Sequence, residues 1–310
     1  MLEKRVTESP VMTSRQLFFL IGYSLLFVVC VAAMIWWQRR QRQRRTPFDH
    51  EVRLLRRAGE SQLRHVLEMD ESSVLWLVMA GSIPAVLALF CAMGTTLLPP
   101  SLHLAGLAVS ALVFVVTFIL SAGWFAGKTA ESHNRYLGYF GERIVGEHLD
   151  ALKAQGWKVF HDVPVDHDEH PFNLDHVAVG PTGVFVVETK TRRKGRARPG
   201  FDSHKVYFDG HALVWPWGED NHGLDQAERN AQWLAELLRA ELREDIPVTP
   251  FLTLPGWFVE MKPAQEPRPC RVTNPKGLDK LLPNGPVVLS DTQIAAIAAK
   301  LDQLCRDVEF

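Results

Sequence analysis

The stretch DHVAVGPTGVFVVETK, residues 175–190, is the most informative segment for the fold of the second half of this 310-residue chain. Two valine-rich runs flank the turn-forming sequence GPTG at 180–183, and this pattern predicts a β-hairpin. With the turn at that place, Asp175 lies directly opposite Glu188. Because side chains alternate along a strand, one face of the hairpin carries Asp175, Val177, Val179, Val184, Val186, Glu188 and Lys190.

Two carboxylates therefore face each other at one end of the hairpin. Directly opposed Cβ atoms lie about 4.5–5.5 Å apart, so Asp175 and Glu188 repel each other unless a proton or a cation lies between them. Oxygen ligands favour Mg²⁺ or Mn²⁺ over Zn²⁺, and Lys190 on the same face could orient a water molecule or stabilise a developing negative charge. The spacing alone is equally compatible with a solvated hairpin end at which Lys190 neutralises Glu188.

Patterns on either side of the hairpin predict a mixed α/β domain around one sheet. Apolar residues at helical spacing indicate an amphipathic helix over about 130–154. Runs rich in valine and aromatic residues indicate strands. The elements expected, in chain order, are strands at 157–165, 174–179 and 184–190, a hairpin around 209–210, a helix over about 224–242, strands at 248–259 and 286–290, and a last helix over about 291–305, with a Pro-rich loop at 263–275.

The first half of the chain contains three uncharged apolar runs, 17–37, 74–98 and 104–125. A helix of about 20 residues crosses a hydrocarbon core of about 30 Å, so each run predicts a transmembrane helix, and the last two predict a helical hairpin. The first run exceeds the apolar core of a signal peptide and lacks a small-residue cleavage site after it, which favours a retained anchor.

Basic residues set the expected orientation, because Lys and Arg near span ends stay in the cytoplasm. The segment 38–73 holds nine arginines and the 99–103 loop holds none. We therefore expect an N-terminus at 1–16 outside, an Arg-rich loop at 38–73 inside, and a cytoplasmic domain at 129–310. The run QRRQRQRR at 38–45 could bind nucleic acid, but its place after a span favours contact with anionic lipid headgroups.

Composition and charge agree with this division. The chain is 47% apolar and 22% charged, which excludes a disordered or low-complexity protein. Residues 1–130 carry a net charge of +5, and residues 131–310 carry −6. The four cysteines form neither a disulfide framework nor a C-x-x-C metal motif, so we expect all four to be reduced packing residues.

A helix that carries Gly141-Glu142-Arg143, an Asp-His strand and a strand ending in Glu-Thr-Lys resemble the nuclease-related domain (NERD) family, a branch of the PD-(D/E)XK nuclease superfamily. The resemblance covers about 138–242. It implies a restriction-endonuclease-like mixed sheet flanked by helices, here preceded by an all-α three-helix transmembrane region. It also implies hydrolysis of DNA or RNA phosphodiester bonds with Mg²⁺ or Mn²⁺, and, with the compact anchor, a prokaryotic inner membrane.

Residue by residue, the resemblance implies that Asp175 and Glu188 are metal ligands and that Lys190 positions the attacking water or the scissile phosphate. Glu142 would complete the site from its helix. Helical spacing does not choose between Glu142 and Glu147, which flank the apolar face on opposite sides; only the Gly-Glu-Arg match does. Gln226 follows a segment that lacks the family's proline and has one extra residue, so it is either a site residue or an N-terminal helix residue.

A basic run, TRRKGRAR at 191–198, directly follows the carboxylate pair. Its place suits a phosphate backbone held against the metal, although charge runs are commonly solvated loops. The candidate nucleic-acid-binding residues are Arg192, Arg193, Lys194, Arg196 and Arg198. Trp215 and Trp217 could stack on bases, but core aromatics at a strand end are the stronger expectation.

Histidines and aspartates near the hairpin offer a rival zinc site. Its candidate residues are His161, Asp162, His167, Asp168, His170 and His176. His176 points to the opposite face from Asp175, so one convergent set is not implied. Three functions compete: a membrane-anchored, metal-dependent nuclease, a membrane-tethered module that binds nucleic acid or nucleotide without cleavage, and a membrane interaction protein. The intact set of Asp175, Glu188 and Lys190 favours the first over the second.

Overall fold

The structure is a computed structural model that describes residues 14–43, 53–165, 172–262 and 266–308. Its contacts divide the chain into two units, each described here by itself. The helical unit comprises Met1–Pro47 and Leu67–His133, and the sheet unit comprises Phe48–Val66 and Asn134–Phe310. The elements are α1 (Ser14–Gln43), β1 (Leu54–Leu55), α2 (Glu60–Thr95), η1 (Pro100–Leu102), α3 (His103–Asp150), η2 (Ala151–Gln155), β2 (Lys158–Val165), β3 (Phe172–Gly180), β4 (Gly183–Thr189), β5 (Lys205–Phe208), β6 (Leu213–Trp215), β7 (Gly218–Glu219), α4 (His222–Leu242), β8 (Val248–Thr253), β9 (Phe258–Met261), β10 (Arg271–Thr273), η3 (Pro275–Gly277), α5 (Leu278–Leu281), α6 (Asp291–Cys305) and β11 (Arg306–Val308).

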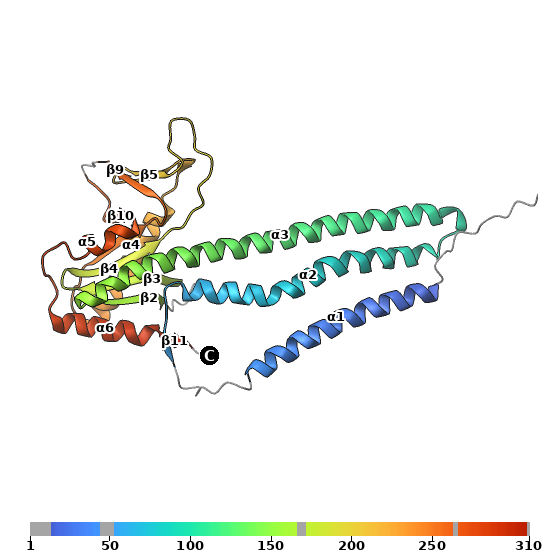
Figure 1. The fold of residues 1–310 in the computed structure, drawn as a ribbon, viewed down its shortest axis with the longest axis horizontal. Helices are drawn as coiled ribbons and strands as arrows, with labels where there is room; N and C mark the ends of the chain where they lie inside the picture. The colour runs from blue at the N-terminus through green and yellow to red at the C-terminus, as the bar shows by residue number, and fades with distance from the viewer. Residues whose placement is uncertain (1–13, 44–52, 166–171, 263–265, 309–310) are drawn as a thin grey trace, which may run out of the picture. The chain divides into compact units, whose positions relative to one another are not determined.

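In the helical unit, α2 and the first part of α3 form the expected hairpin (Figure 1). Trp76 packs edge-on against Trp124, with 6.1 Å between the ring centroids. Near the η1 turn, a Cβ added at Gly106 would overlap the side chain of Thr95. A small residue thus lets the two backbones approach closely, as in membrane helix pairs.

The three helices of this unit are long and apolar enough to cross a membrane. Their most apolar windows have mean hydropathies of 1.8, 2.3 and 2.5 and are almost entirely unburied within the chain. Large apolar side chains such as Phe19, Phe90 and Leu104 are exposed. In water such a surface would be unfavourable, whereas a hydrocarbon environment covers it without cost.

The sheet unit is built on a five-stranded mixed sheet in the order β10-β8-β4-β3-β2. β2, β3 and β4 form an antiparallel meander. β8 and β10 join it in parallel, β8 after the crossover through α4. The mixed α/β fold expected from the sequence is therefore confirmed.

Both faces of this sheet are covered by helices (Figure 1). On one face, Val177, Val179, Val184 and Val186 pack against buried residues of α4 and α6. On the other face, Ala178, Phe185 and Val187 pack against Val145 and other residues of α3, η2 and α5. This double coverage explains why β4 is a continuous apolar run and not an alternating one.

The expectation of a single sheet is wrong, because the hairpin around 209–210 joins a separate four-stranded sheet in the order β7-β6-β5-β9. The predicted strand at 248–259 is two strands: β8 belongs to the first sheet and β9 to the second. A turn between them contains Gly256 at φ +79°, a conformation that glycine adopts readily.

Two further expectations are corrected near the C-terminus. Residues 286–290 are not a strand; the backbone N–H groups of Val288 and Leu289 both donate to the carbonyl of Pro181 in the β3–β4 turn. The predicted loop at 263–275 contains β10, which pairs in parallel with β8 and buries Val272. Residues 263–265 of that segment lie outside the described part of the chain.

The described residues of the segment predicted as a loop at 38–73 include parts of two helices and a short strand. α1 continues to Gln43, α2 begins at Glu60, and Phe48–Val66 belongs to the sheet unit. β1 pairs with β11, and Arg56 forms ion pairs with Asp162 and Asp307. Arg44 and Arg45 lie outside the described residues.

Candidate functional site

The β3–β4 hairpin has the register predicted from its sequence. The pairs run from His176–Val187 to Gly180–Gly183, which extends to Asp175 opposite Glu188. Asp175 Oδ2 accepts a hydrogen bond of 2.7 Å from the backbone N–H of Thr189. The ends of the two strands are thus joined by the Asp175 carboxylate.

Glu188 is held by groups from two elements. Its side chain is 1% exposed, and its Oε1 lies 2.9 Å from Lys190 Nζ. Its Oε2 accepts a 2.9 Å hydrogen bond from the side-chain amide of Asn230 on α4. Lys190 Nζ also donates to Gln226 Oε1 at 2.8 Å. Gln226 therefore contacts Lys190 and also lies in the first turns of α4.

Glu142 approaches the same cluster from α3, and the two helical glutamates differ in burial. Glu142 is 6% exposed, whereas the Glu147 side chain is 74% exposed and pairs with Arg143. A Cβ added at Gly141 would overlap the hydroxyl of Thr191. Glycine at that position therefore lets α3 approach the segment that follows β4, next to Glu142.

The electrostatics of the cluster show that these residues interact as a group. Burial raises the pKa of Glu142 to about 8, and the charges of Asp162 and Glu188 add to the rise. Burial, then the charges of Glu188 and Glu142, raise the pKa of Asp175 well above its usual range.

The two residues that pair in the cluster also have shifted pKa values. Burial raises the pKa of Glu188 despite the opposing charge of Lys190. Burial lowers the pKa of Lys190, but the charges of Glu188 and Asp175 outweigh burial, so its pKa is raised overall. Three carboxyl groups, of which Glu142 and Glu188 are buried and Asp175 is partly buried, thus share one lysine. The cluster has an excess of negative charge whenever more than one carboxyl ionises.

This donor set has the chemistry of a hard divalent-cation site. Carboxylate oxygens and an amide oxygen are the ligands that Mg²⁺ and Mn²⁺ prefer, and a cation would relieve the repulsion among Glu142, Asp175 and Glu188. Among the described residues, however, no three His, Cys, Asp or Glu side chains are gathered at metal-binding spacing. The Lys190 ammonium compensates Glu188 in this arrangement.

The rival zinc set does not converge within the described residues. His161 Nδ1 lies 2.9 Å from His176 Nδ1, and His161 Nε2 lies 2.9 Å from Asp150 Oδ1. Asp162 instead accepts hydrogen bonds from Arg56 and from Ser61. The other three candidates, His167, Asp168 and His170, lie outside the described residues.

The basic run at 191–198 lies in the segment between β4 and β5 and contacts aromatic rings. Arg192 pairs with Asp220 and lies 5.4 Å from the Trp215 ring centroid. Lys194 lies 5.8 Å from the Trp257 centroid, and Arg198 lies 4.5 Å from the Phe201 centroid. The exposed members of the run are Arg193, Lys194, Arg196 and Arg198.

The two tryptophans proposed as a stacking surface have different environments. Trp215 is 2% exposed and belongs to the core of the second sheet. Trp217 is 37% exposed and stacks on Trp215, with 5.5 Å between the centroids. The expectation that these tryptophans are core residues is confirmed for Trp215.

Sequence reasoning missed two residues of the cluster. Asn230 lies four residues after Gln226 on α4, so the two share a helical face; this spacing was the available signal. Asp162 was considered only as a zinc ligand, yet it raises the pKa of Glu142. Its backbone has φ +50°, and nothing in its local sequence marks that conformation.

Comparison with known families gives one match. Residues 137–255 match the family model of the nuclease-related domain, NERD, which confirms the resemblance and includes all the clustered residues from Glu142 to Asn230. No curated protein matches the chain. No solved structure matches it either.

Proposed function

We propose that the nuclease-related domain at residues 137–255 hydrolyses phosphodiester bonds of DNA or RNA with the help of a divalent cation, and that the N-terminal helices anchor it in a membrane. One observation carries the proposal: Lys190 Nζ lies 2.9 Å from the buried carboxylate of Glu188, and the partly buried Asp175 and the buried Glu142 face the same charges. A fold rarely gathers three carboxyl groups at a structural cost unless they serve a function.

The residues that would hold the cation are Asp175, Glu188 and Glu142. Mg²⁺ or Mn²⁺, when bound, supplies Lewis-acid polarisation of a phosphate oxygen and lowers the pKa of a water molecule. The carboxyl of Glu142, with its pKa raised to about 8, holds a proton at neutral pH. It must lose that proton to act as a ligand.

Lys190 is suited to bind phosphate and unsuited to act as a base. Its neighbours raise its pKa, so it keeps its positive charge at neutral pH. Its ammonium can donate to a phosphate oxygen and stabilise the negative charge that develops during hydrolysis. Gln226 and Asn230 hold Lys190 and Glu188 in position.

The orientation of the anchor is also part of the proposal. Arg39, Arg40 and Arg42 follow the apolar part of α1 directly, while the short connection between α2 and α3 carries no Lys or Arg. The positive-inside rule then places the domain in the cytoplasm, with the N-terminus outside, and we propose a prokaryotic inner membrane as the location.

Cleavage by the full chain tests the enzyme proposal. The full chain is the right material because β1 and Arg56 are integral to the sheet unit. Purified protein in detergent is incubated with single- and double-stranded DNA and RNA in Mg²⁺, Mn²⁺ or EDTA. We expect metal-dependent cleavage that Asp175→Asn and Lys190→Met abolish and that the exposed-residue control Glu147→Gln retains.

A second candidate function is a tethered module that binds nucleic acid without cutting it. The observation that favours it is the absence of a ready three-ligand group among the described residues, with Lys190 compensating Glu188. In that case no substrate is cut under any condition, while nucleic acid still binds. A chain that neither cuts nor binds nucleic acid and shows no thermal stabilisation by Mg²⁺ or Mn²⁺ would be an interaction protein.

A further inference from the structure

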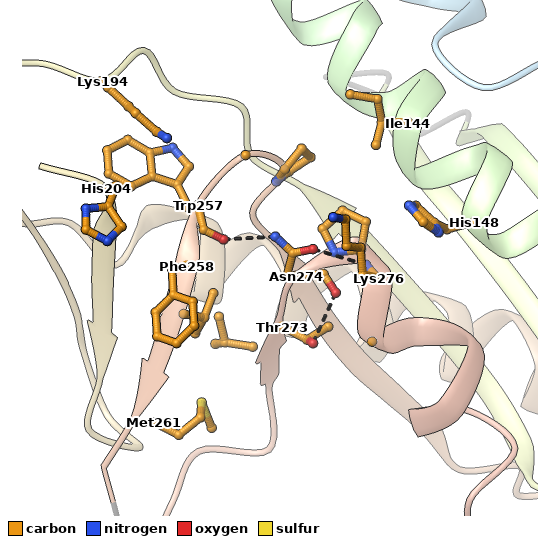
Figure 2. A pocket seen from close by; sticks show the side chains of 16 residues that line it. Ile144, His148, Lys194, His204, Trp257, Phe258, Met261, Thr273, Asn274 and Lys276 are labelled. Atoms are coloured by element: carbon orange, nitrogen blue, oxygen red, sulfur yellow. Dashed lines mark hydrogen bonds between the residues drawn. The ribbon is translucent and has the colours of Figure 1, made fainter.

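A second concave feature of the sheet unit is not used by the carboxylate cluster. It is a cavity of about 790 Å³ bounded by α3, the segment after β4, the β8–β9 turn, β9, β10 and η3. This volume lies within the range of small-molecule sites, about 300–1,000 Å³. In Figure 2, Ile144 and His148 of α3 face Trp257 and Lys276 across it.

The cationic side chains of the lining are Lys194 and Lys276. His148 and His204 also line the cavity, and the described lining residues include no Asp or Glu. This pattern stands out because residues 131–310 carry 21 Lys and Arg against 27 Asp and Glu. A cavity with only basic titratable groups in an acidic domain favours an anionic ligand.

The apolar lining is flat and partly exposed. The indole of Trp257 is fixed by donating its N–H to the backbone carbonyl of Arg192. Phe258 is 57% exposed and Met261 is 56% exposed on the same side of the cavity. Phe258 is the exposed aromatic ring of this lining, because Trp257 is 1% exposed. An exposed ring beside cations is the kind of element with which proteins bind nucleic acid bases and phosphates together.

The uncharged polar groups of the lining are already paired. The Asn274 side chain donates to the Trp257 carbonyl and accepts from the backbone N–H of Lys276. Thr273 Oγ1 donates to the Asn274 carbonyl (Figure 2). The groups left for a ligand are therefore the two lysines and the exposed ring of Phe258, which has Lys205 Nζ 6.0 Å from its centroid. Such groups recognise a phosphate and any base and give little sequence discrimination.

We propose that this cavity binds one nucleotide unit, with its phosphate at Lys194 and Lys276 and its base against Phe258. The proposal rests on the nucleic-acid substrate of the proposed function but does not require cleavage. Lys194 connects the two sites, because it belongs both to the basic run after β4 and to the cavity lining. The unit is either a free mononucleotide or one residue of a strand.

Binding without turnover tests the proposal. Full-length protein in EDTA is titrated into a fluorescent eight-nucleotide single strand and, separately, into a fluorescent mononucleotide, at several salt concentrations. Phe258→Ala should weaken binding about tenfold, since base stacking on one ring contributes that order of affinity. Lys276→Ala should weaken binding and reduce the salt slope by about one. Lys280→Ala is the matched control, an exposed lysine outside the cavity lining that should bind as the unmodified chain does.

The outcomes separate this proposal from the nuclease proposal. If both cavity variants lose strand binding and the unmodified chain does not bind the mononucleotide, the cavity binds one residue of a strand. If the unmodified chain binds the mononucleotide and both variants lose that binding equally, the cavity binds a free nucleotide. Unchanged binding in both variants overturns the cavity proposal even where Mg²⁺-dependent cleavage is present. Cavity-dependent binding by a chain that never cleaves overturns the nuclease proposal and leaves this one standing.

Discussion

Replacing Glu142 by Gln should stabilise the cation-free protein while abolishing any cleavage. Glu142 is 6% exposed, and burial together with the charges of Asp162 and Glu188 raises its pKa from 4.5 to about 8. A carboxyl whose pKa is raised by folding is easier to ionise in the unfolded chain. Ionisation therefore favours unfolding, and Gln removes this penalty because it has the same shape and no charge.

The penalty depends on pH in a defined way. Below pH 4.5 the carboxyl is neutral in both states, and Glu142 contributes no penalty. As pH rises from 4.5 to about 8, the unfolded state loses the proton and the folded state keeps it, so stability falls. Above pH 8 the penalty is constant. At about 1.4 kcal/mol per pKa unit, the full shift corresponds to roughly 5 kcal/mol, and about 1 kcal/mol of it is present at pH 5.

Thermal unfolding of the detergent-purified full chain in EDTA measures this effect. For a domain of this size, 1 kcal/mol shifts Tm by about 2–4 °C, so Glu142→Gln should raise Tm by on the order of 10 °C at pH 8.5 and by a few degrees at pH 5. Glu147→Gln on the same helix is the control, because that side chain is 74% exposed. It should leave Tm unchanged at both pH values.

A Glu142→Gln variant whose Tm matches that of the unmodified chain at pH 8.5 would refute the reasoning. A gain of equal size at pH 5 and pH 8.5 would refute it too, because it would show that the variant repacks the helix and does not remove a titrating charge. The cluster would then not be a repulsive carboxylate site, and the basis for a cation there would be lost.

Two further predictions concern the packing of the sheet unit. Arg56→Ala should destabilise it by about 3–5 kcal/mol, because the side chains of Arg56 and Asp162 are 9% and 4% exposed and their charged atoms lie 3.0 Å apart. The Tm of this variant should be lower than that of the exposed control Arg57→Ala. Equal Tm values for the two variants would contradict the buried ion pair. Burial raises the pKa of Cys270 and Cys305 to about 12, so neither thiol should react with iodoacetamide at pH 8 until denaturant is added. Rapid labelling of either cysteine in the folded protein, located by peptide mapping, would show that its burial is wrong.

Local patterns were sufficient for the elements whose stabilising contacts are close in sequence. The GPTG turn fixed the β3–β4 register, because only that register places the valines of one face together under α4 and α6. The last helix was predicted at its observed bounds, since Ser290 and Gln293 form a reciprocal N-terminal cap. The apolar runs at 17–37 and 104–125 lie within α1 and α3, and the run at 74–98 lies within α2 as far as Thr95.

Elements whose contacts are distant in sequence were predicted less well. The run at 286–290 has strand-forming residues, but its N–H groups meet Pro181 in place of a neighbouring strand. The Pro-rich segment hid β10, which depends on a parallel partner 20 residues earlier in the chain. The hairpin around 209–210 was recognised as a hairpin, yet nothing local assigns it to a second sheet.

The candidate site divides in the same way. Local sequence was enough to place Asp175 opposite Glu188, with Lys190 on the same face, because a strand alternates its side chains and a short turn fixes which residues face each other. Long-range packing, in contrast, buries Glu142 and exposes Glu147, brings Gln226 and Asn230 onto Lys190 and Glu188, and joins Arg56 to Asp162. These contacts depend on the rotation of α3 and α4 about their axes and on the meeting of chain segments more than 100 residues apart. Burial of the apolar faces against the sheet determines the helix rotation and brings the distant segments together.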